Sequence, residues 1–162
     1  MVKELHFITD GMLGKLTRWL RMLGHDVEYY RAADDKKLVL LAETQKRILL
    51  TSDQKLHQQM LKKGLESVLV NMSDDSQRLA ILAKRYGFKL IIDLSISRCP
   101  KCNSVLAKVT KQKVLDRIPK MTSAYYDDFW ECTNCGQVYW QGAHWKQIQA
   151  TLNEAINRLK LL

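Results

Sequence analysis

The sequence predicts an α/β fold, in which helices cover both faces of a parallel sheet, followed by a smaller cysteine-rich unit. Three observations lead to this prediction. Short strand-like segments alternate with single helical segments up to residue 94, the strand-like segments are apolar almost throughout, and all four cysteines come after residue 98. Strands without a polar side are typical of parallel sheets that lie between helices. We therefore expect an α/β domain over residues 1–94 and a cysteine-rich unit over residues 95–162.

Five apolar segments have the length and composition of strands. They are residues 5–9, 26–30, 47–52, 67–72 and 89–93. Four segments between them have the apolar spacing of helices, namely residues 12–23, 36–46, 54–63 and 76–87. In the first of these, leucines recur at intervals of three and four residues from Leu13 to Leu23, and Gly24 is a suitable stop signal.

A longer amphipathic helix is predicted at residues 145–161. Its apolar side chains recur at helical spacing, at Ile148, Leu152, Ile156 and Leu159. Because such a helix has one apolar face to bury, we expect it to pack against one of the two units.

The four cysteines form two closely spaced pairs. Cys99 and Cys102 lie in RCPKC, Cys132 and Cys135 lie in ECTNCG, and 29 residues separate the two pairs. Each two-residue gap lets a tight turn aim both thiolates at one ion, so the two turns supply the four sulfur ligands of a tetrahedral Zn²⁺. We predict a structural zinc ribbon, because four cysteine ligands leave no open position for chemistry.

Two alternatives to zinc are a pair of disulfides and a redox-active C-x-x-C motif. A reducing cytoplasm disfavours the first, and the second does not need another copy of the motif. His144, in WQGAHW, is an additional candidate ligand, although packing or hydrogen bonding is the role we expect for it.

The charge balance indicates a polyanionic partner. Lys and Arg number 26 against 17 Asp and Glu, a net charge of +9. Phosphate contacts release condensed counterions, so nucleic acid is the leading candidate, with a basic but merely soluble protein as the alternative. No apolar run reaches the roughly 20 residues that span a bilayer, and the N-terminal segment lacks a signal-peptide pattern. We therefore expect a cytoplasmic protein with no membrane partner.

Aspartates follow the predicted strands. Asp10 comes after the first strand and Asp53 after the third. The others are Asp34 and Asp35 after the second strand, Asp74 and Asp75 after the fourth, and Asp93 at the end of the fifth. Because the carboxyl ends of parallel strands share one edge of the sheet, where such folds hold their sites, we expect these carboxylates to converge.

Converging carboxylates need a counter-charge. Two unit charges about 4 Å apart repel by roughly 4 kcal/mol at an effective dielectric constant of about 20. Mg²⁺ or Mn²⁺ would offset this repulsion, because both ions prefer oxygen ligands; protonation of some carboxylates is the alternative. Lys15, Arg18 and Arg21 lie on the following helix, and a carboxylate-held metal beside basic side chains suits phosphodiester hydrolysis.

Each of these features also has a purely structural explanation. Aspartate is common just before a helix, so Asp10, Asp53 and Asp75 are also suitable N-caps. The three basic residues, in turn, are also compatible with a solvated helix face.

Four stretches of the chain resemble one known family. They are FITDGMLGKLTRWLRMLGHDVEYY, DDKKLVLLAETQKRILLTSD, RCPKCNSVL and FWECTNCGQVYWQGAHW. In this order they are similar to the Mut-seven C-terminal RNase-domain family, a PIN-like nuclease domain followed by a zinc ribbon, and the similarity runs over nearly the entire chain. The resemblance implies a PIN-like parallel-sheet sandwich and a metal-dependent ribonuclease, so that RNA is the expected partner. PIN-like domains often pair, which leaves the oligomeric state open and a homodimer among the options.

The resemblance also implies a set of acids. Asp10 looks like the first PIN acid, and Asp53, in LLTSD, looks like the acid after the third strand. The second acid is usually carried by the segment after strand two, where Asp35 is chosen over Asp34 and Glu43. These three aspartates are the expected catalytic residues and ligands of Mg²⁺ or Mn²⁺, and the metal is expected to lower the pKa of the attacking water.

Two departures from the family pattern stand out. The ribbon ends in GAHW where the family more often has GSHW. The fourth PIN acid has no single match, since Asp74, Asp75 and Asp93 compete, which leaves open whether one metal or two bind. A reduced acid set is also compatible with weak or lost activity.

Basic and aromatic residues complete the expected RNA surface. The flanking phosphates are assigned to Lys15, Arg18, Arg21 and Arg47. The segment between the cysteine pairs adds Lys108, Lys111, Lys113, Arg117 and Lys120, with Tyr125, Tyr126 and Trp130 available for base stacking. For Trp130, Trp140 and Trp145 a place in the core of the small unit is the expected role.

Two other functions are compatible with the sequence. A non-catalytic RNA-binding adaptor would use the basic charge and the ribbon, with the aspartates acting only as caps. A metal-dependent phosphatase or other phosphoryl-transfer enzyme is the third reading, although the extended basic surface favours a polymer over a small substrate.

Overall fold

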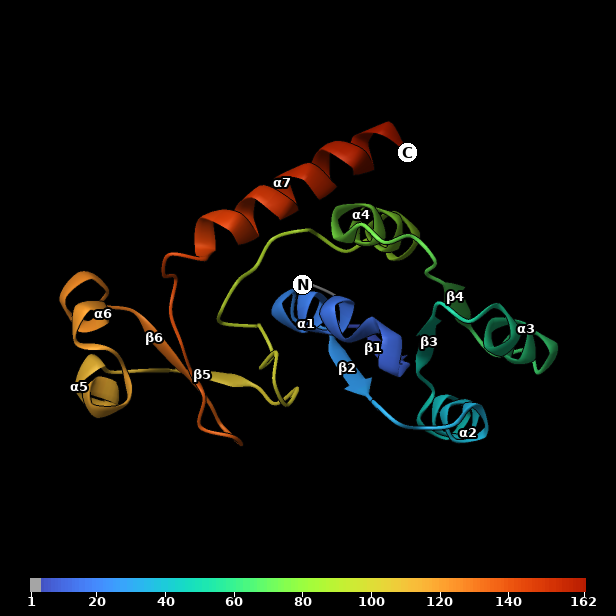
Figure 1. Ribbon diagram of the computed structural model, residues 1–162, viewed down its shortest axis with the longest axis horizontal. Coiled ribbons are helices and arrows are strands. Elements are labelled where there is room, and N and C mark those ends of the chain that lie inside the picture. The colour runs from blue at the N-terminus through green and yellow to red at the C-terminus, as the bar shows by residue number, and fades with distance from the viewer. Residues whose placement is uncertain (1–3) are drawn as a thin grey trace.

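A four-stranded parallel sheet lies between two layers of helices in the computed structural model, which describes residues 4–162 (Figure 1). The first three residues of the predicted α/β domain lie outside the described part. The strands are β1 (His6–Thr9), β2 (Asp26–Tyr29), β3 (Ile48–Thr51) and β4 (Ser67–Leu69), in the order β2-β1-β3-β4. The prediction of a parallel α/β fold is confirmed.

The two helix layers explain why the strands are apolar on both sides. The helices are α1 (Gly14–Met22), preceded by the short 3-10 helix η1 (Gly11–Leu13), α2 (Asp35–Gln45), α3 (Gln54–Lys62) and α4 (Asp75–Tyr86). Phe7 and Leu50 belong to the core shared with α1 and α4, whereas Ile8 and Leu49 belong to the core shared with α2 and α3. Neighbouring residues of one strand thus enter opposite cores, as the side-chain period of two requires.

The predicted fifth strand at residues 89–93 is wrong, because this segment forms no strand. Phe88, Leu90 and Ile92 are buried, while Lys89 and Ile91 between them are exposed. The segment therefore lays one apolar side on the core without pairing to the sheet. Alternation indicates a half-buried extended chain, but it does not specify a neighbouring strand. Asp93 accordingly does not end a strand.

The cysteine-rich unit contains a small antiparallel sheet. Its strands are β5 (Leu106–Val109), β6 (Phe129–Cys132) and β7 (Val138–Tyr139), in the order β5-β6-β7. The long connection from β5 to β6 folds into α5 (Lys111–Val114), the 3-10 helix η2 (Leu115–Arg117) and α6 (Lys120–Tyr125). A separate core of Val114, Ile118, Phe129 and Val138 holds this unit together.

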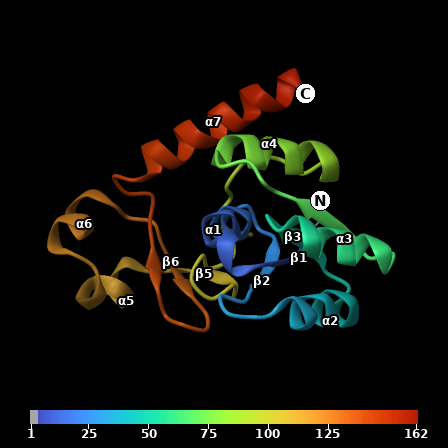
Figure 2. The ribbon, with the colours of Figure 1, turned by 45° about the vertical axis from the view of Figure 1, so that its right-hand side comes forward.

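The C-terminal helix α7 (Trp145–Leu161) has the predicted bounds and returns to the α/β domain. It packs along α4, as both views show (Figures 1 and 2). Leu152 and Ala155 are buried in the same core as Leu79 and Leu82 of α4. The cysteine-rich unit is thus connected to the domain at both of its ends. No helix within residues 4–162 is long and apolar enough to cross a membrane.

Candidate functional site

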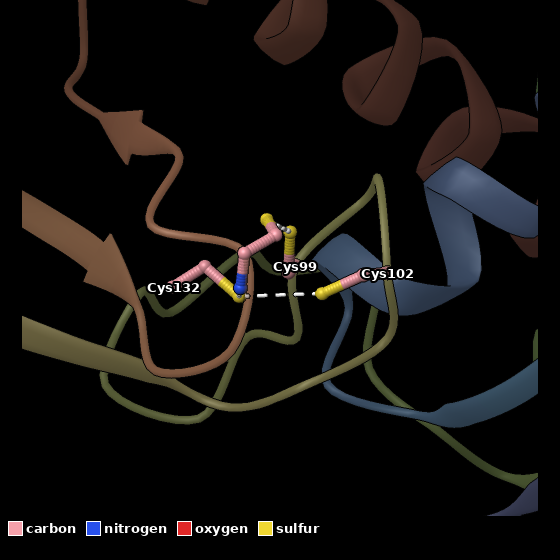
Figure 3. A group of neighbouring side chains, drawn as sticks. Cys99, Cys102 and Cys132 are labelled. Atoms are coloured by element: carbon pink, nitrogen blue, oxygen red, sulfur yellow. Dashed lines mark hydrogen bonds between the residues drawn. The ribbon is translucent and has the colours of Figure 1, made fainter.

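The four cysteines come together in one group, of which Figure 3 labels Cys99, Cys102 and Cys132. Their Sγ atoms all lie within 4.8 Å of one another, with Cys99 and Cys135 3.7 Å apart and Cys102 and Cys132 3.3 Å apart. No disulfide joins them. Four sulfurs placed about 2.3 Å from a tetrahedral Zn²⁺ would lie about 3.8 Å apart. The cluster therefore fits a zinc site, as the spacing predicts.

The surroundings shift the pKa values of Cys102 and Cys132 in opposite directions. Burial raises the pKa of the Cys132 thiol to about 12. Burial raises the pKa of Cys102, but hydrogen bonds, above all from Ser104, outweigh it and lower this pKa to about 6. The hydroxyl of Tyr139 lies 3.0 Å from the Cys99 Sγ. Hydrogen-bond donors around metal ligands stabilise the thiolates and orient them. His144 is exposed just before α7 and is not part of the group.

Asn103 attaches the first cysteine pair to the edge of the parallel sheet. Its backbone adopts a left-handed conformation (φ 71°), which asparagine tolerates. Its amide nitrogen donates to Asp26 Oδ1 (2.6 Å), and its amide oxygen accepts from the backbone N–H of Val27 (3.0 Å). Burial raises the pKa of Asp26, but hydrogen bonds from Arg47, Asn103 and His6 outweigh it and lower this pKa to about 2.

Arg21 makes a second connection and differs from its expected role. It is 6% exposed, and its guanidinium donates to the carbonyl oxygens of Val27 (2.7 and 3.0 Å) and Pro100 (3.0 Å). Burial lowers the pKa of Arg21, and the nearby Glu28 carboxylate counteracts this. The guanidinium therefore ties α1 to β2 and to the first cysteine turn. We revise the expectation that it holds an RNA phosphate.

Asp10 lies at the carboxyl edge of the sheet, directly after β1. It is 8% exposed, its Oδ1 accepts from the backbone N–H of Met12 (2.9 Å), and its Oδ2 accepts from the hydroxyl of Thr51. The Thr51 hydroxyl oxygen also accepts from the backbone N–H of Asp53 (3.0 Å). One hydroxyl thus connects the residues that end the neighbouring strands β1 and β3.

Asp53 caps α3 and is exposed. One oxygen of its carboxylate accepts from the backbone N–H groups of Lys55 (2.7 Å) and Leu56 (3.1 Å). The capping role that the sequence allowed is therefore present. It leaves the carboxylate group at the surface beside the Thr51 bridge to Asp10.

The loop after β2 passes close to Asp10. The carbonyl oxygen of Arg31 lies so close to Gly11 that any side chain on Gly11 would clash with it. Further along this loop, Asp34 caps α2 and Asp35 is exposed in its first turn. A strand order with β1 between β2 and β3 therefore places Asp10 between the segments that carry Asp35 and Asp53.

Asp75 is buried on the side of the sheet that α1 and α4 cover. It accepts from Lys15 Nζ (2.8 Å) and from Trp19 Nε1 (3.2 Å), both on α1. The ammonium of Lys15 is thus balanced by a carboxylate, although its side chain remains largely exposed. Asp74 caps α4 and pairs with Arg158 of α7 at 3.2 Å. Sequence reasoning missed the Lys15–Asp75 pair, because its members are 60 positions apart in the chain and no local pattern connects them.

Fewer acids come together at the edge of the sheet than expected. Apart from the cysteines, residues 4–162 hold no group of three or more His, Cys, Asp or Glu whose ligand atoms all lie within 4.8 Å. The structure connects Asp10 and Asp53 through Thr51, and it does not gather Asp35 with them. Thr51 is the residue that sequence reasoning missed; its place two residues before Asp53, in LLTSD, is the only local signal.

Arg47 and Arg18 have different positions. Arg47 precedes β3, so it lies at the opposite end of that strand from Asp53. It donates to Asp26 Oδ2 (3.0 Å) and to the Phe7 carbonyl (3.2 Å), which connects the starts of three strands and removes it from the acidic edge. Arg18 is exposed on α1.

Four of the five basic residues expected to bind RNA between the cysteine pairs are paired with acids of the same unit. The pairs are Lys108–Asp128 (2.7 Å), Lys111–Asp127 (2.8 Å), Lys113–Glu131 (2.7 Å) and Arg117–Glu131 (2.7 Å). Of the aromatics in this region, Trp140 packs on the core of the unit, Trp145 packs on the core of the domain, and Tyr125 is exposed. Trp130 is half-buried beneath Lys108, whose Nζ lies 5.6 Å from the ring centroid.

The sequence matches the model of a known family. The model of the Mut7-C RNAse domain family matches residues 5–152, nearly the whole described chain. No curated protein and no solved structure matches the sequence.

Proposed function

Since the chain belongs to the Mut7-C RNAse domain family, whose description implies RNA as substrate, we propose that it is a metal-dependent ribonuclease. The proposed centre is the carboxyl edge of the parallel sheet, with Asp10, Asp53 and Asp35 as its acids. The observation that supports it most directly is the Thr51 bridge, which joins the residues after β1 and β3. Asp10 and Asp53 follow the neighbouring strands β1 and β3, at the edge where parallel sheets of this kind hold their sites.

The donor chemistry at this edge suits a hard cation. Asp10 and Asp53 offer carboxylate oxygens, which would hold Mg²⁺ or Mn²⁺ together with oxygens of the substrate, because Mg²⁺ commonly uses only one or two carboxylates beside phosphates and water. When bound, such an ion activates water and neutralises negative charge that develops on the phosphate. Asp35, on the loop that adjoins Gly11, is the proposed third acid.

The residues of the chain would orient the reactants. Thr51 holds the Asp10 carboxylate in one direction through its hydroxyl, and the N–H of Met12 fixes the other oxygen. Arg18, exposed one helix turn further on than Lys15, would hold a phosphate of the RNA by charge-assisted hydrogen bonds. Lys15 would contribute positive potential beside Asp75.

Substitutions by asparagine test this proposal well. Labelled single-stranded RNA is incubated with the purified chain and Mn²⁺, and the rate of cleavage is compared for the parent, Asp10→Asn and Asp53→Asn. Asparagine is as good an N-cap as aspartate, so Asp53→Asn removes the charge while the start of α3 stays capped. We expect each substitution to reduce cleavage roughly 100-fold or more, as the loss of a metal ligand or of charge stabilisation does.

Two matched controls complete the experiment. Asp116→Asn, in an exposed part of the cysteine-rich unit, should leave cleavage unchanged. Asp34→Asn keeps the cap of α2, so a loss with Asp35→Asn but not with Asp34→Asn would support Asp35 as the second acid. Cleavage that survives both Asp10→Asn and Asp53→Asn would point to a contaminating nuclease and contradict the proposal.

A non-catalytic RNA-binding adaptor is the second candidate function. The observation that favours it is the use of Asp10, Asp34, Asp53 and Asp74 as caps at helix starts. The same experiment separates the two candidates, because an adaptor binds the labelled RNA without cleaving it in the presence of Mn²⁺.

A further inference from the structure

A cavity of about 370 Å³ opens between α1 and the cysteine-rich unit. Thr17 and Arg18 of α1 line one wall, and Pro100 and Lys101, within the first cysteine turn, line another. Tyr29, at the end of β2, also lines the cavity. Its volume is in the range of pockets that take small molecules, roughly 300–1,000 Å³.

The charged groups that face this cavity are all positive. Arg18, Arg21 and Lys101 line it, and no carboxylate does. The guanidinium of Arg21 is occupied by carbonyl oxygens, which leaves Arg18 and Lys101 as the cations able to contact a ligand. Both are exposed, and neither takes part in a salt bridge within the described residues. By contrast, four basic residues of β5 and the β5–β6 connection are paired with nearby carboxylates.

The cavity begins beside the acidic edge. The hydroxyl of Tyr29 donates to the carbonyl oxygen of Gly11 (3.1 Å), the residue directly after Asp10. Gly14, the first residue of α1, lines the cavity next to Tyr29. The wall that Tyr29 and Gly14 form is therefore in contact with the backbone that directly follows Asp10.

A second cavity, lined by aromatic residues, adjoins the first. Gln137 and Tyr139 line both cavities, and the second has a volume of about 480 Å³. Its walls include Tyr125, Tyr126, Trp140 and Trp145. A positive groove followed by aromatic rings is the arrangement by which proteins hold single-stranded nucleic acid, with phosphates in the groove and bases against the rings.

We propose that these two cavities form a binding track for single-stranded RNA, in which Arg18 and Lys101 hold one backbone phosphate and the aromatic cavity receives a base. The track rests on the proposed ribonuclease function, because it leads the strand to Asp10. The cysteine-rich unit is thereby part of the substrate site: it supplies Lys101, which the first cysteine turn positions. A duplex does not fit, since double-stranded RNA is recognised across a wide, shallow groove and not within a pocket.

RNA binding without cleavage tests the track independently of catalysis. All variants carry Asp10→Asn, no Mg²⁺ or Mn²⁺ is added, and chelators are avoided so that zinc stays bound. Fluorescence anisotropy of a labelled single-stranded RNA then gives the dissociation constant. We expect Lys101→Ala and Arg18→Ala each to weaken binding roughly tenfold, as the loss of one charge-assisted contact does. The slope of log K against log salt should fall by about 0.7, the value for one phosphate of a single strand.

Lys160→Ala is the matched control, because Lys160 is an exposed lysine near the end of α7, remote from both cavities. It should leave the dissociation constant unchanged. The zinc content of each variant is measured as well, and we expect full zinc content in Lys101→Ala because the cysteine cluster stays intact. If Arg18 and Lys101 hold the same phosphate, the double variant loses less affinity than the product of the two single losses.

Three results would overturn the proposal. The first is unchanged affinity in both Lys101→Ala and Arg18→Ala with full zinc content. The second is an equal loss in Lys160→Ala, which would indicate only a diffuse effect of charge. The third is competition by double-stranded RNA as strong as that by single-stranded RNA. None of these depends on cleavage, so a failure of the track and a failure of the nuclease proposal are distinguishable.

Discussion

The hydroxyl of Thr51 donates a hydrogen bond to the carboxylate of Asp10, across the pair of neighbouring strands β1 and β3. Both residues are buried, and the same hydroxyl accepts from the backbone N–H of Asp53. The relative position of the two proposed acids is therefore held by the sheet itself, as a preorganised site requires.

Thr51→Val should impair cleavage more than binding. The substitution keeps the branched shape but removes the hydroxyl, so the Asp10 carboxylate loses a donor and the N–H of Asp53 loses an acceptor. We expect the cleavage rate with Mn²⁺ to fall roughly 10- to 100-fold, because misplaced reacting groups are costly. Urea unfolding should show a loss of about 1–3 kcal/mol from the unsatisfied buried groups.

Thr44→Val is the control for this change. The Thr44 hydroxyl donates to the carbonyl oxygens of Leu40 (2.8 Å) and Leu41 (3.4 Å), both within its own exposed helix turn. Its removal should change the free energy of unfolding by less than about 0.5 kcal/mol and leave cleavage intact. Equal effects of the two substitutions would contradict a specific role for Thr51.

The buried His25 should make stability depend on pH. Its ring packs edge-on against Phe7 and Phe88, Nδ1 accepts from the backbone N–H of Leu5 (3.4 Å), and Nε2 has no partner among the described residues. Burial lowers the pKa of His25 to about 4. Between its ordinary value of about 6.5 and pH 4, the unfolded chain binds a proton that the folded chain does not. The free energy of unfolding should thus fall by up to about 3 kcal/mol as pH drops through this window.

His25→Phe should flatten that pH dependence. Urea unfolding at several pH values between 4 and 7 measures the free energy of unfolding of parent and variant. The slopes of this free energy against pH are compared, because the substitution also changes packing and so the absolute values. Release of zinc in acid affects parent and variant alike, so it cancels in the difference. The exposed His144 provides the control variant His144→Gln. An equal slope in the parent and in His25→Phe would contradict this prediction.

Asn103 should contribute both conformation and hydrogen bonds. Asn103→Gly removes the amide contacts to Asp26 and Val27 but keeps a residue suited to a positive φ, whereas Asn103→Ala loses both. We expect a loss of about 1–3 kcal/mol for Asn103→Gly and about 1 kcal/mol more for Asn103→Ala. Hydrogen exchange at the Val27 amide should be faster in both variants. Unchanged exchange there would show that the amide contact is not formed.

Zinc removal should affect RNA binding as well as folding. We expect one zinc per chain, and its loss by chelation should unfold the cysteine-rich unit, because the free energy of metal binding contributes to the stability of small units of this kind. Pro100 and Lys101 would then lose their fixed positions, so Arg21 loses a hydrogen-bond partner and the proposed track loses one wall. Affinity for single-stranded RNA should fall and return when zinc is added back. A zinc-free chain with full affinity would contradict this coupling.

Much of the fold could be predicted from local patterns. The alternation of apolar strands and helices, the bounds of α7 and the four-cysteine cluster all follow from short-range spacing, which is set by the geometry of one strand, one helix or one turn. The segment at 89–93 shows where this reasoning fails. Its apolar residues predict a buried strand, but only alternate side chains are buried and the segment pairs with no strand, because pairing depends on whether another strand has a free edge beside it.

The candidate site was predicted only in part, since the aspartates could be placed at one edge of the sheet but not at definite distances from one another. Asp10 and Asp53 are linked because Thr51 turns its hydroxyl toward both, whereas Asp75 turns toward Lys15 and Trp19. The strand order decides which ends are neighbours, and this order is not written in the periodicity of any single strand.

By itself, the sequence determined the α/β layering, the cysteine cluster and the excess of positive charge, because each depends on composition or on spacing within a few residues. Only the tertiary structure decided which basic side chains are free to contact a ligand. Arg21 is occupied by the carbonyl of Pro100, 79 residues further along the chain, while Arg18, one helical turn away, shares a cavity with Lys101. A charged group that is buried without hydrogen bonds is destabilising, so a buried guanidinium is hydrogen-bonded to the groups around it. Those groups come from segments that only folding brings together.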